Sequence, residues 1–354
     1  MSAQPLPTES HAWADAIALL RAWPRTRLAN LPTPLLRAGR LAERIGIGNA
    51  YVKMDAETGF ALGGNKVRKL EFELAPSRLE GITCLITAGG PQSNHCRVTA
   101  AAAARLGLDC VLVLNGPEPA TPSGNALLHR LFGASVVTVE DRSDRVPRMD
   151  RESERISVNG GRALILPIGA STGLGSLGYA LCALELLEQL DSCDDGCVET
   201  VLFVSSSSCG TLGGLVLGLA LAGRTDVHLV GVSADASAEE LRRTSLTLAA
   251  EGASLLGLGA TSDVARSIEA VPLDTDDAQV GAGYGMRTPA ADAATEDFAR
   301  LEGIVLDPTY SSKAAAGMIQ RIENTGLGDD QRAVFLHTGG APGLLAGAFS
   351  RTSS

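Results

Sequence analysis

The sequence predicts an α/β protein built on a mainly parallel, doubly wound sheet, and three observations support this fold class. Short runs rich in β-branched residues alternate along the chain with Ala- and Leu-rich stretches of helical length. The hydrophobic share is 45% but aromatic residues make up only 4%, so small aliphatic side chains have to pack the helices onto the sheet. The length of 354 residues allows two medium-sized units, and we expect two subdomains.

The expected elements follow one another in a βαβ rhythm. Strands are predicted at residues 82–87, 109–114, 135–139, 163–168, 200–204, 228–232 and 333–336. Helices are predicted between them at residues 93–106, 125–132, 175–190 and 210–222. The charged stretch 140–161 is expected to be a surface connection. In such a sheet the binding sites lie at the carboxyl ends of the strands.

Composition and charge exclude several classes of partner. The formal net charge is −10 and the Lys and Arg residues are scattered, so we expect neither nucleic-acid nor anionic-membrane binding. Residues 1–10 lack the pattern of a signal peptide, and no apolar stretch is long enough to span a bilayer. Seven cysteines, an odd number, fit a reducing compartment, which predicts a cytoplasmic protein. Cys193 and Cys197 lack a second Cys or His pair at zinc spacing, so no metal is expected.

The first candidate for a catalytic or ligand-binding site is the segment Gly63-Gly64-Asn65-Lys66-Val67-Arg68-Lys69. Two glycines let the backbone approach a ligand closely. Three cations within four residues lower one another's pKa and attract an anion. A lysine nucleophile needs such a lowered pKa, because its free amine is mostly protonated at neutral pH. Taken alone, the segment is more typical of a solvated basic turn.

Two further segments join a strand to a helix. Ala88-Gly89-Gly90-Pro91-Gln92-Ser93-Asn94-His95 offers hydroxyl, amide and backbone N–H donors that suit a carboxylate, although Ser93 or Asn94 could equally cap the helix. Ser205-Ser206-Ser207-Ser208-Cys209-Gly210-Thr211 places small hydroxyl residues where a phosphate can bind. This second segment lacks the Gly-Lys-Ser/Thr ending of a P-loop, which disfavours nucleotide hydrolysis.

Two other sequence patterns bear on ligand binding. Residues 173–178 match the G-x-G-x-x-G pattern of dinucleotide-binding proteins, but the next strand does not end in the acidic residue that binds the ribose. Two of the four tyrosines, Tyr284 and Tyr310, lie in glycine- or proline-containing turns. Such turns suit residues that face a ligand, although a tyrosine at the edge of the core is the alternative.

Together these segments resemble the pyridoxal 5′-phosphate (PLP)-dependent family of D-cysteine desulfhydrase and 1-aminocyclopropane-1-carboxylate (ACC) deaminase. The motifs GGNKVRKLEF, QSNHCR, GYG, LEGIVLDPTYSSKAAAGM and FLHTGGAPGL occur in the family's order. The resemblance implies a tryptophan-synthase β-like fold, known as fold type II, and a homodimer. It also implies a larger PLP-binding subdomain of residues 1–69 and 181–354 and a smaller α/β subdomain of residues 70–180.

The resemblance also implies a role for each matching residue. Lys66 would hold PLP as a Schiff base and move the Cα proton, together with Ser93, Tyr284 and Tyr310 as catalytic residues. The remaining cofactor-binding residues would be Lys69, Asn94, Ser208, Cys209, Gly210, Thr211, Ser311 and Thr338. The substrate would contact Ser93, Asn94, His95 and Tyr284.

The activity implied by the resemblance is a carbon–sulfur lyase acting on a small amino acid. Ser311 occupies the position at which the deaminases carry Glu, and His95 the position at which they carry Gln. A hydroxyl beside the pyridine nitrogen gives a weaker electron sink, which suits loss of a good leaving group from Cβ. D-cysteine is therefore the expected substrate, and cysteate sulfo-lyase or ACC-type deaminase activity are the alternatives. A non-catalytic PLP-binding protein is the alternative from another class.

Overall fold

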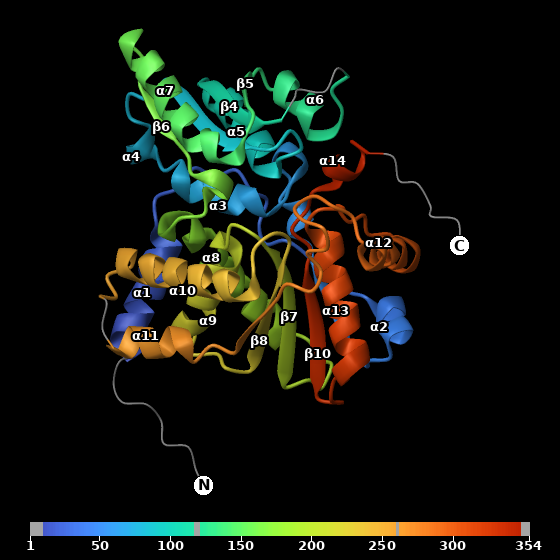
Figure 1. Ribbon diagram of the computed structural model, residues 1–354. Coiled ribbons are helices and arrows are strands. Elements are labelled where there is room, and N and C mark those ends of the chain that lie inside the picture. Colours follow the sequence, from blue (N-terminus) through green and yellow to red (C-terminus); the bar gives the residue numbers. More distant parts are fainter. Residues whose placement is uncertain (1–9, 117–120, 260–261, 348–354) are drawn as a thin grey trace.

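The computed structural model describes residues 10–116, 121–259 and 262–347, which form two α/β parts, one above the other in Figure 1. The larger, lower part contains a six-stranded sheet in the order β1-β2-β10-β7-β8-β9, and the smaller, upper part a four-stranded sheet in the order β5-β4-β3-β6. Every neighbouring pair of strands is parallel except β1 and β2. The predicted fold class is therefore confirmed.

The larger sheet is covered on both faces. Its strands are β1 (Leu35–Arg37), β2 (Ala50–Lys53), β7 (Glu199–Ser206), β8 (Val227–Ser233), β9 (Leu273–Asp276) and β10 (Gln331–Leu336). Leu202 and Val204 of β7 pack with α1 (Ser10–Ala22), α8 (Gly173–Asp191), α9 (Gly210–Leu221), α10 (Ala238–Leu255) and α11 (Ser262–Glu269). Val201 and Phe203 point the other way, toward α2 (Gly39–Ile45), α12 (Pro289–Glu302) and α13 (Ser311–Thr325). Burial on both faces explains the continuous apolar run in β7.

The smaller sheet consists of β3 (Cys84–Gly89), β4 (Asp109–Asn115), β5 (Ser135–Val139) and β6 (Ala163–Ile165). Helices α3 (Asn65–Glu73) and α5 (Asn94–Leu106) pack on one face of it, and α7 (Arg145–Val158) covers the other. The short helix α4 (Pro76–Leu79) precedes β3, and α6 (Gly124–Leu131) contacts α14 (Ala341–Leu344) near the C-terminus.

The stretch 140–161 is not the surface connection that the sequence suggested. It contains α7, because Met149 and Ile156, two turns apart, turn one face of the helix toward the sheet. Several of its charged residues, such as Asp150, Arg151 and Glu154, are exposed to solvent. The smaller sheet lies within the predicted range 70–180, whereas residue 180 falls inside α8, and α8 packs along its length on α9 and α10.

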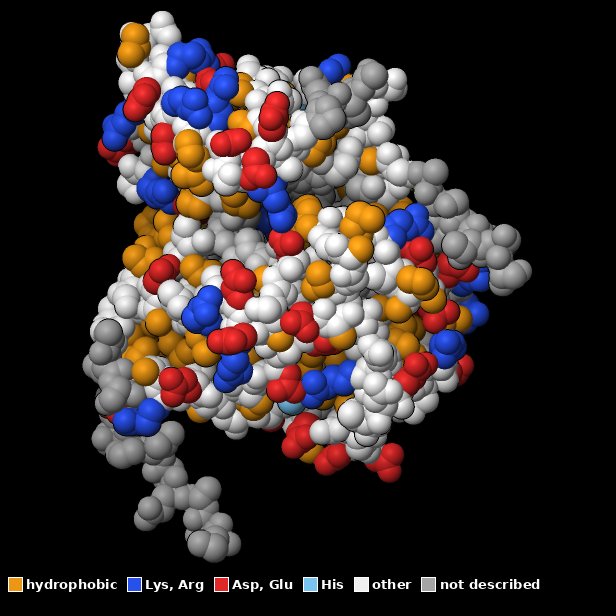
Figure 2. All heavy atoms as spheres, viewed as in Figure 1, with side chains coloured by type: hydrophobic (Ala, Val, Ile, Leu, Met, Phe, Trp, Pro, Cys, Tyr) orange, Lys and Arg blue, Asp and Glu red, His pale blue; other side chains and the backbone are white. Residues whose placement is uncertain are grey.

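The surface gives no further guide to function. Figure 2 shows acidic and basic side chains scattered over this face rather than gathered by sign. Among the residues that the structure describes, no helix is both long and apolar enough to cross a membrane. The same residues contain no group of three or more His, Cys, Asp or Glu side chains arranged to hold a metal ion.

Candidate active site

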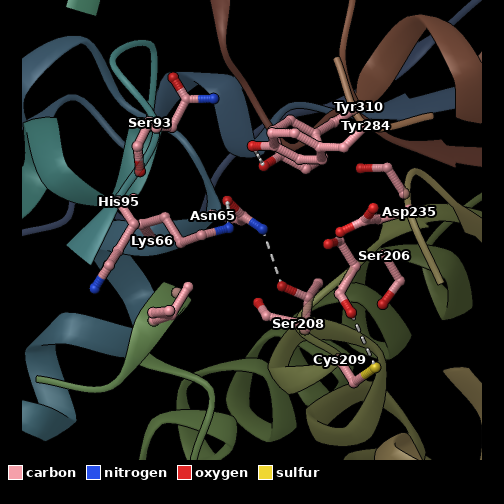
Figure 3. Close-up of a pocket in the computed structure, with 18 of the residues that line it drawn as sticks. Asn65, Lys66, Ser93, His95, Ser206, Ser208, Cys209, Asp235, Tyr284 and Tyr310 are labelled. Atoms are coloured by element: carbon pink, nitrogen blue, oxygen red, sulfur yellow. Dashed lines mark hydrogen bonds between the residues drawn. The ribbon is translucent and has the colours of Figure 1, made fainter. Parts of the chain in front are cut away.

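A cavity of about 260 Å³ lies where the two parts meet. Its walls come from the carboxyl ends of β3 and β7 and from the amino ends of α3 and α5, as expected for parallel sheets. Lys66 and Ser93 lie on one side of it, Tyr284, Tyr310 and Asp235 face them, and Ser208 and Cys209 close a third side (Figure 3). The three segments selected from the sequence therefore meet in one cavity.

The loop that precedes Lys66 is held in an unusual shape. Gly63 and Gly64 both have positive φ, and a Cβ on Gly63 would lie only 1.9 Å from the carbonyl oxygen of Ala56. The buried guanidinium of Arg97 donates to the carbonyl oxygens of Ala61 and Gly63, the latter at 3.0 Å. The two glycines are thus required by the backbone itself, and Arg97 fixes the loop against α5.

The amine of Lys66 is poised to react. It donates to Oδ1 of Asn65 at 3.0 Å, and Nδ2 of Asn65 donates in turn to Oγ1 of Thr211 at 2.9 Å. Burial lowers the pKa of Lys66 to about 8, although the nearby carboxylate of Asp307 acts in the opposite direction. An amine with this pKa has an appreciable neutral, nucleophilic fraction at physiological pH. Sequence reasoning did not identify Asn65, which joins the lysine to the opposite wall.

The amino end of α9 forms a hydroxyl-lined cup. Ser171 donates to Oγ of Ser208 at 2.8 Å and accepts from the backbone N–H of Gly210 at 3.2 Å. A Cβ on Gly169 would lie 2.4 Å from Oγ of Ser208, and one on Gly210 would lie 2.7 Å from Oγ of Ser171. Glycine at both positions therefore keeps the cup open, and the helix terminus favours an anion there. No motif recognised in the sequence contains Ser171.

Lys69 does not line the cavity. Its side chain is only 1% exposed, and its amine donates to Oγ of Ser171 at 3.0 Å. Burial, and then the charge of Lys66, hold the pKa of this amine well below its usual range. Lys69 lies nearly one helical turn after Lys66, and its amine contacts the cup through Ser171.

The amino end of α5 lies on the same side of the cavity as Lys66 (Figure 3). Oγ of Ser93 caps the helix by accepting from the backbone N–H of Cys96 at 3.2 Å, and Oδ1 of Asn94 accepts from Nδ2 of Asn125 at 2.9 Å. Both Ser93 and Asn94 line the cavity, so Ser93 caps the helix and faces the cavity at the same time. The terminus of this 13-residue helix suits a carboxylate.

His95 also lines the cavity, and it is neutral. The hydroxyl of Thr87 donates to the carbonyl oxygen of Leu166 at 2.8 Å, so it accepts from Nε2 of His95 at 2.9 Å. This arrangement assigns the ring proton to Nε2. Burial, followed by the charges of Lys66 and Lys69, keeps the pKa of His95 well below its usual range.

The two tyrosines form a pair. Their hydroxyls are hydrogen-bonded to each other, and their ring centroids lie 5.9 Å apart with an angle of 68° between the planes. Burial raises the pKa of both Tyr284 and Tyr310. Both hydroxyls are therefore protonated, and the one that accepts within the pair keeps its own proton free to donate toward the cavity.

The two hydroxyls expected near the cofactor ring differ in position. Oγ1 of Thr338 lies 3.0 Å from Oγ of Ser205, and both residues line the cavity. Ser311, by contrast, is completely buried and donates to Oδ1 of Asp307 at 2.6 Å. Ser311 does not line the cavity, because its hydroxyl holds the carboxylate that precedes α13.

Three charged residues that line the cavity were not predicted from the sequence. Arg142 and Arg145 come from the stretch that was interpreted as a surface connection, and Asp235 follows β8. No motif contains them, so only the meeting of the two sheets brings them to the cavity. They add two positive charges and one negative charge to the lining of the cavity.

Comparisons with known proteins agree on one family. The family described as pyridoxal-phosphate dependent enzyme matches residues 26–339. A D-cysteine desulfhydrase of Salmonella typhi is 39% identical over 332 residues, which cover 92% of this chain and 97% of that protein. The crystal structure of an ACC deaminase homologue has a TM-score of 0.82 at 31% identity, covering 94% of this chain and 96% of the other. A pyridoxal 5′-phosphate-dependent aspartate racemase shares the fold, with a TM-score of 0.61 at 15% identity and coverages of 95% and 97%.

Proposed function

Because this chain belongs to the family of pyridoxal-phosphate dependent enzymes, we propose that it is a lyase that eliminates the β-substituent of a small amino acid, with D-cysteine as the substrate. The overall reaction takes D-cysteine and water to pyruvate, hydrogen sulfide and ammonia. The observation that carries the proposal is the amine of Lys66, which lies in one cavity with the cup at α9 and the capped end of α5. The 39% identity to D-cysteine desulfhydrases supports the choice of substrate.

The groups around the cavity fit PLP. The chain has only four lysines, and Lys66 alone among them lines the cavity, so it is the amine available to the cofactor's aldehyde. The glycine-walled cup at α9 suits the phosphate. Thr338 and Ser205 offer hydroxyls to the ring, whereas the hydroxyl of Ser311 is already engaged by Asp307.

When bound, PLP supplies an electron sink for the negative charge that develops at the substrate's Cα. The chain's own residues would do the rest. Lys66, with its lowered pKa, would take the proton from Cα. The amino end of α5, with Ser93 and Asn94, would hold the carboxylate, and the protonated tyrosine pair would donate to the leaving sulfur, which departs with the electron pair of the C–S bond.

The first experiment locates the cofactor. Borohydride reduction of the holoenzyme followed by peptide mapping should find PLP on Lys66, and Lys66→Ala should abolish pyruvate release from D-cysteine. With a pKa of about 8 for this amine, cofactor attachment to the apoprotein should slow about tenfold for each pH unit below 8. A reduced adduct on Lys53, Lys69 or Lys313, or a pH dependence that continues to rise toward 10, would contradict the assignment.

The second experiment separates the lyase from its alternatives. Steady-state rates on D-cysteine and ACC should favour D-cysteine at least a hundredfold, equivalent to about 2.7 kcal/mol of barrier. Pyruvate from D-cysteine would exclude a non-catalytic PLP-binding protein. Comparable efficiency on ACC would favour deaminase activity instead.

The proposal extends to the cell and to assembly. The odd number of cysteines supports a cytoplasmic location. The resemblance to the family supports a homodimer. Light scattering of the purified protein should give twice the 36.5 kDa mass of the chain, and a monomer would refute the second point.

A further inference from the structure

The segment that carries Tyr284 does not fix this side chain by itself. Residues 277–288 connect β9 to α12 without forming a helix or a strand. Gly283 and Gly285, on either side of Tyr284, have φ angles of 142° and 75°, in the range that residues other than glycine rarely adopt. Such a backbone gives a tyrosine little support, so the contact between Tyr284 and Tyr310 requires an anchor elsewhere in the molecule.

Lys313, the third residue of α13, contacts this segment. Its amine donates to the carbonyl oxygens of Val280 at 2.6 Å and Gly283 at 3.3 Å. The residue is completely buried, and within the described part of the chain no salt bridge includes it. Both hydrogen bonds therefore tie α13 to the segment, and the second ends on the residue next to Tyr284.

A cation at this position is unfavourable for stability on two counts. Lys313 lies in the first turn of α13, at the positive end of the helix dipole. Its charge is also removed from water without a carboxylate in ion-pair contact. An apolar side chain of the same length would fill the space without either cost, so packing alone does not account for a lysine here.

The amino end of α13 contacts both tyrosines. Tyr310 is the N-cap residue of this helix, and its backbone N–H donates to Oδ2 of Asp307 at 3.0 Å. The segment of Tyr284 is bound to the next turn of the same helix through Lys313. On the other side, the guanidinium carbon of Arg142 lies 4.7 Å from the centroid of the Tyr284 ring. One helix end therefore sets the backbone of both tyrosines, and Arg142 packs on the ring of one of them.

We propose that Lys313 is a positioning residue of the elimination, because it holds residues 280–283 so that the hydroxyl of Tyr284 stays on that of Tyr310. The inference rests on the proposed function, in which the tyrosine pair donates to the leaving sulfur. One hydroxyl donates to the other, and the hydroxyl that accepts gives its own proton to the sulfur as the C–S bond breaks. Sulfur leaves with the electron pair of that bond, and the hydroxyl regains a proton from water. Without Lys313 the pair separates, and the sulfur has to leave as an unprotonated anion.

The test compares leaving groups that differ in their need for a proton. Sulfur gains a proton as it leaves D-cysteine, whereas chloride leaves β-chloro-D-alanine without one. In the holoenzyme, Lys313→Met should lower kcat for D-cysteine about tenfold or more, and should change kcat for β-chloro-D-alanine less than about threefold. KM for both substrates should change little, because the amino end of α5, the proposed carboxylate site, is not altered. An equal loss on both substrates, or no loss on either, would overturn the proposal.

Arg321→Gln is the matched control. Arg321 is a cation on the same helix, but it pairs with Asp274 of β9 at 2.6 Å, so its removal should leave kcat for both substrates unchanged. Lys313→Gln keeps an N–H donor on a shorter side chain. It should show the same selective loss on D-cysteine in smaller measure, and it takes the place of Lys313→Met if that variant does not fold.

Hydrogen exchange tests the anchor without turnover. In the holoenzyme, the backbone amides of residues 280–286 should exchange about fivefold faster in Lys313→Met than in the wild type, while those of residues 316–324 in α13 keep their wild-type rates. Equal exchange of residues 280–286 in both proteins would refute the positioning role. If these residues exchange faster but the wild type releases no pyruvate from D-cysteine or β-chloro-D-alanine, the proposed lyase function fails while the anchoring by Lys313 stands.

Discussion

The hydrogen bonds of Asp307 explain what the hydroxyl of Ser311 does in the structure. Its carboxylate accepts from the hydroxyl of Ser311 and from the backbone N–H groups of Thr309, Tyr310 and Ser311, at 2.6–3.0 Å. Burial raises the pKa of Asp307, and these four donors stabilise its charge. In the structure, the motif residue Ser311 thus orders the turn that carries Tyr310.

Removal of the Ser311 hydroxyl should therefore lower the free energy of unfolding. Ser311→Ala leaves a buried carboxylate with one donor fewer and should lower the free energy of unfolding by about 1–3 kcal/mol, measured by urea denaturation. Ser311→Glu would place a second carboxylate against Asp307 and should unfold more easily still, without gaining ACC deaminase activity. A stable Ser311→Glu protein that opens ACC would restore the role first expected for Ser311.

Single residues were predictable where a short motif contained them. Lys66, Ser93, Asn94, His95, Ser208 and Thr211 stand in segments whose composition already suggested a ligand, and all line the cavity. Ser171 and Asn65 were not predicted, because an ordinary hydroxyl or amide gives no signal until its partner is known. Their partners, Ser208 and Thr211, lie 37 and 146 residues away in sequence.

At the scale of elements, close contact between helices explains the glycine pattern that resembled a dinucleotide-binding site. A Cβ on Gly173 would lie 2.6 Å from Cβ of Glu251 in α10, and one on Gly178 would lie 2.3 Å from the carbonyl oxygen of Arg68 in α3. On α9, a Cβ on Gly214 would lie 2.2 Å from the carbonyl oxygen of Ser176 in α8. These glycines allow helix backbones to approach closely.

Adding one methyl group at this contact should be destabilising. Gly214→Ala pushes α9 away from α8 and should cost about 1–3 kcal/mol, read from the denaturant midpoint. Because α9 begins at the cup, the same variant should also retain PLP less well in equilibrium dialysis. Gly39→Ala in α2 is the control, since nothing lies within 4 Å of its Cβ position, and it should be neutral or slightly stabilising. Equal midpoints for the two variants would contradict this account of α9.

At the scale of the whole molecule, a buried ionic network ties α3 to the larger sheet. Arg68 donates to both carboxylate oxygens of Asp55 at 2.8 Å and to Glu185 of α8 at 2.9–3.0 Å. Lys53 of β2 donates to Glu185, and Tyr179 of α8 donates to Asp55. Because Lys66 and Arg68 share α3, the network also fixes where the reactive amine lies.

This network predicts how stability depends on pH. Burial acts to raise the pKa of Asp55 and of Glu185, but Arg68 outweighs it and holds both below their usual values. A carboxyl group whose pKa is lower in the folded than in the unfolded protein stabilises the fold at pH values above its unfolded pKa, about 4. This stabilisation is lost as the pH falls through the pKa of the folded state. The wild type should therefore lose stability below about pH 4.

Arg68→Met tests the network directly. It should cost about 3–5 kcal/mol at neutral pH, because it leaves buried carboxylates without their partner, and the difference from wild type should shrink on acidification. Arg21→Gln is the control, since Arg21 pairs with Glu188 of the same helix α8 at 2.6 Å, but both side chains are more than half exposed. It should change stability little. A pH-independent difference between Arg68→Met and wild type would refute the linkage.

The sequence by itself determined the fold class, the family and the cofactor, because strand and helix periodicity and the lysine, serine and glycine motifs are local patterns. It also located seven strands and four helices to within a few residues. The tertiary structure alone decided that Lys69 contacts Ser171, that Ser311 contacts Asp307, and that Arg142 and Arg145 line the cavity. Each of these depends on which distant segments meet, and hydrogen bonds and charges between such segments leave no periodic trace in the chain.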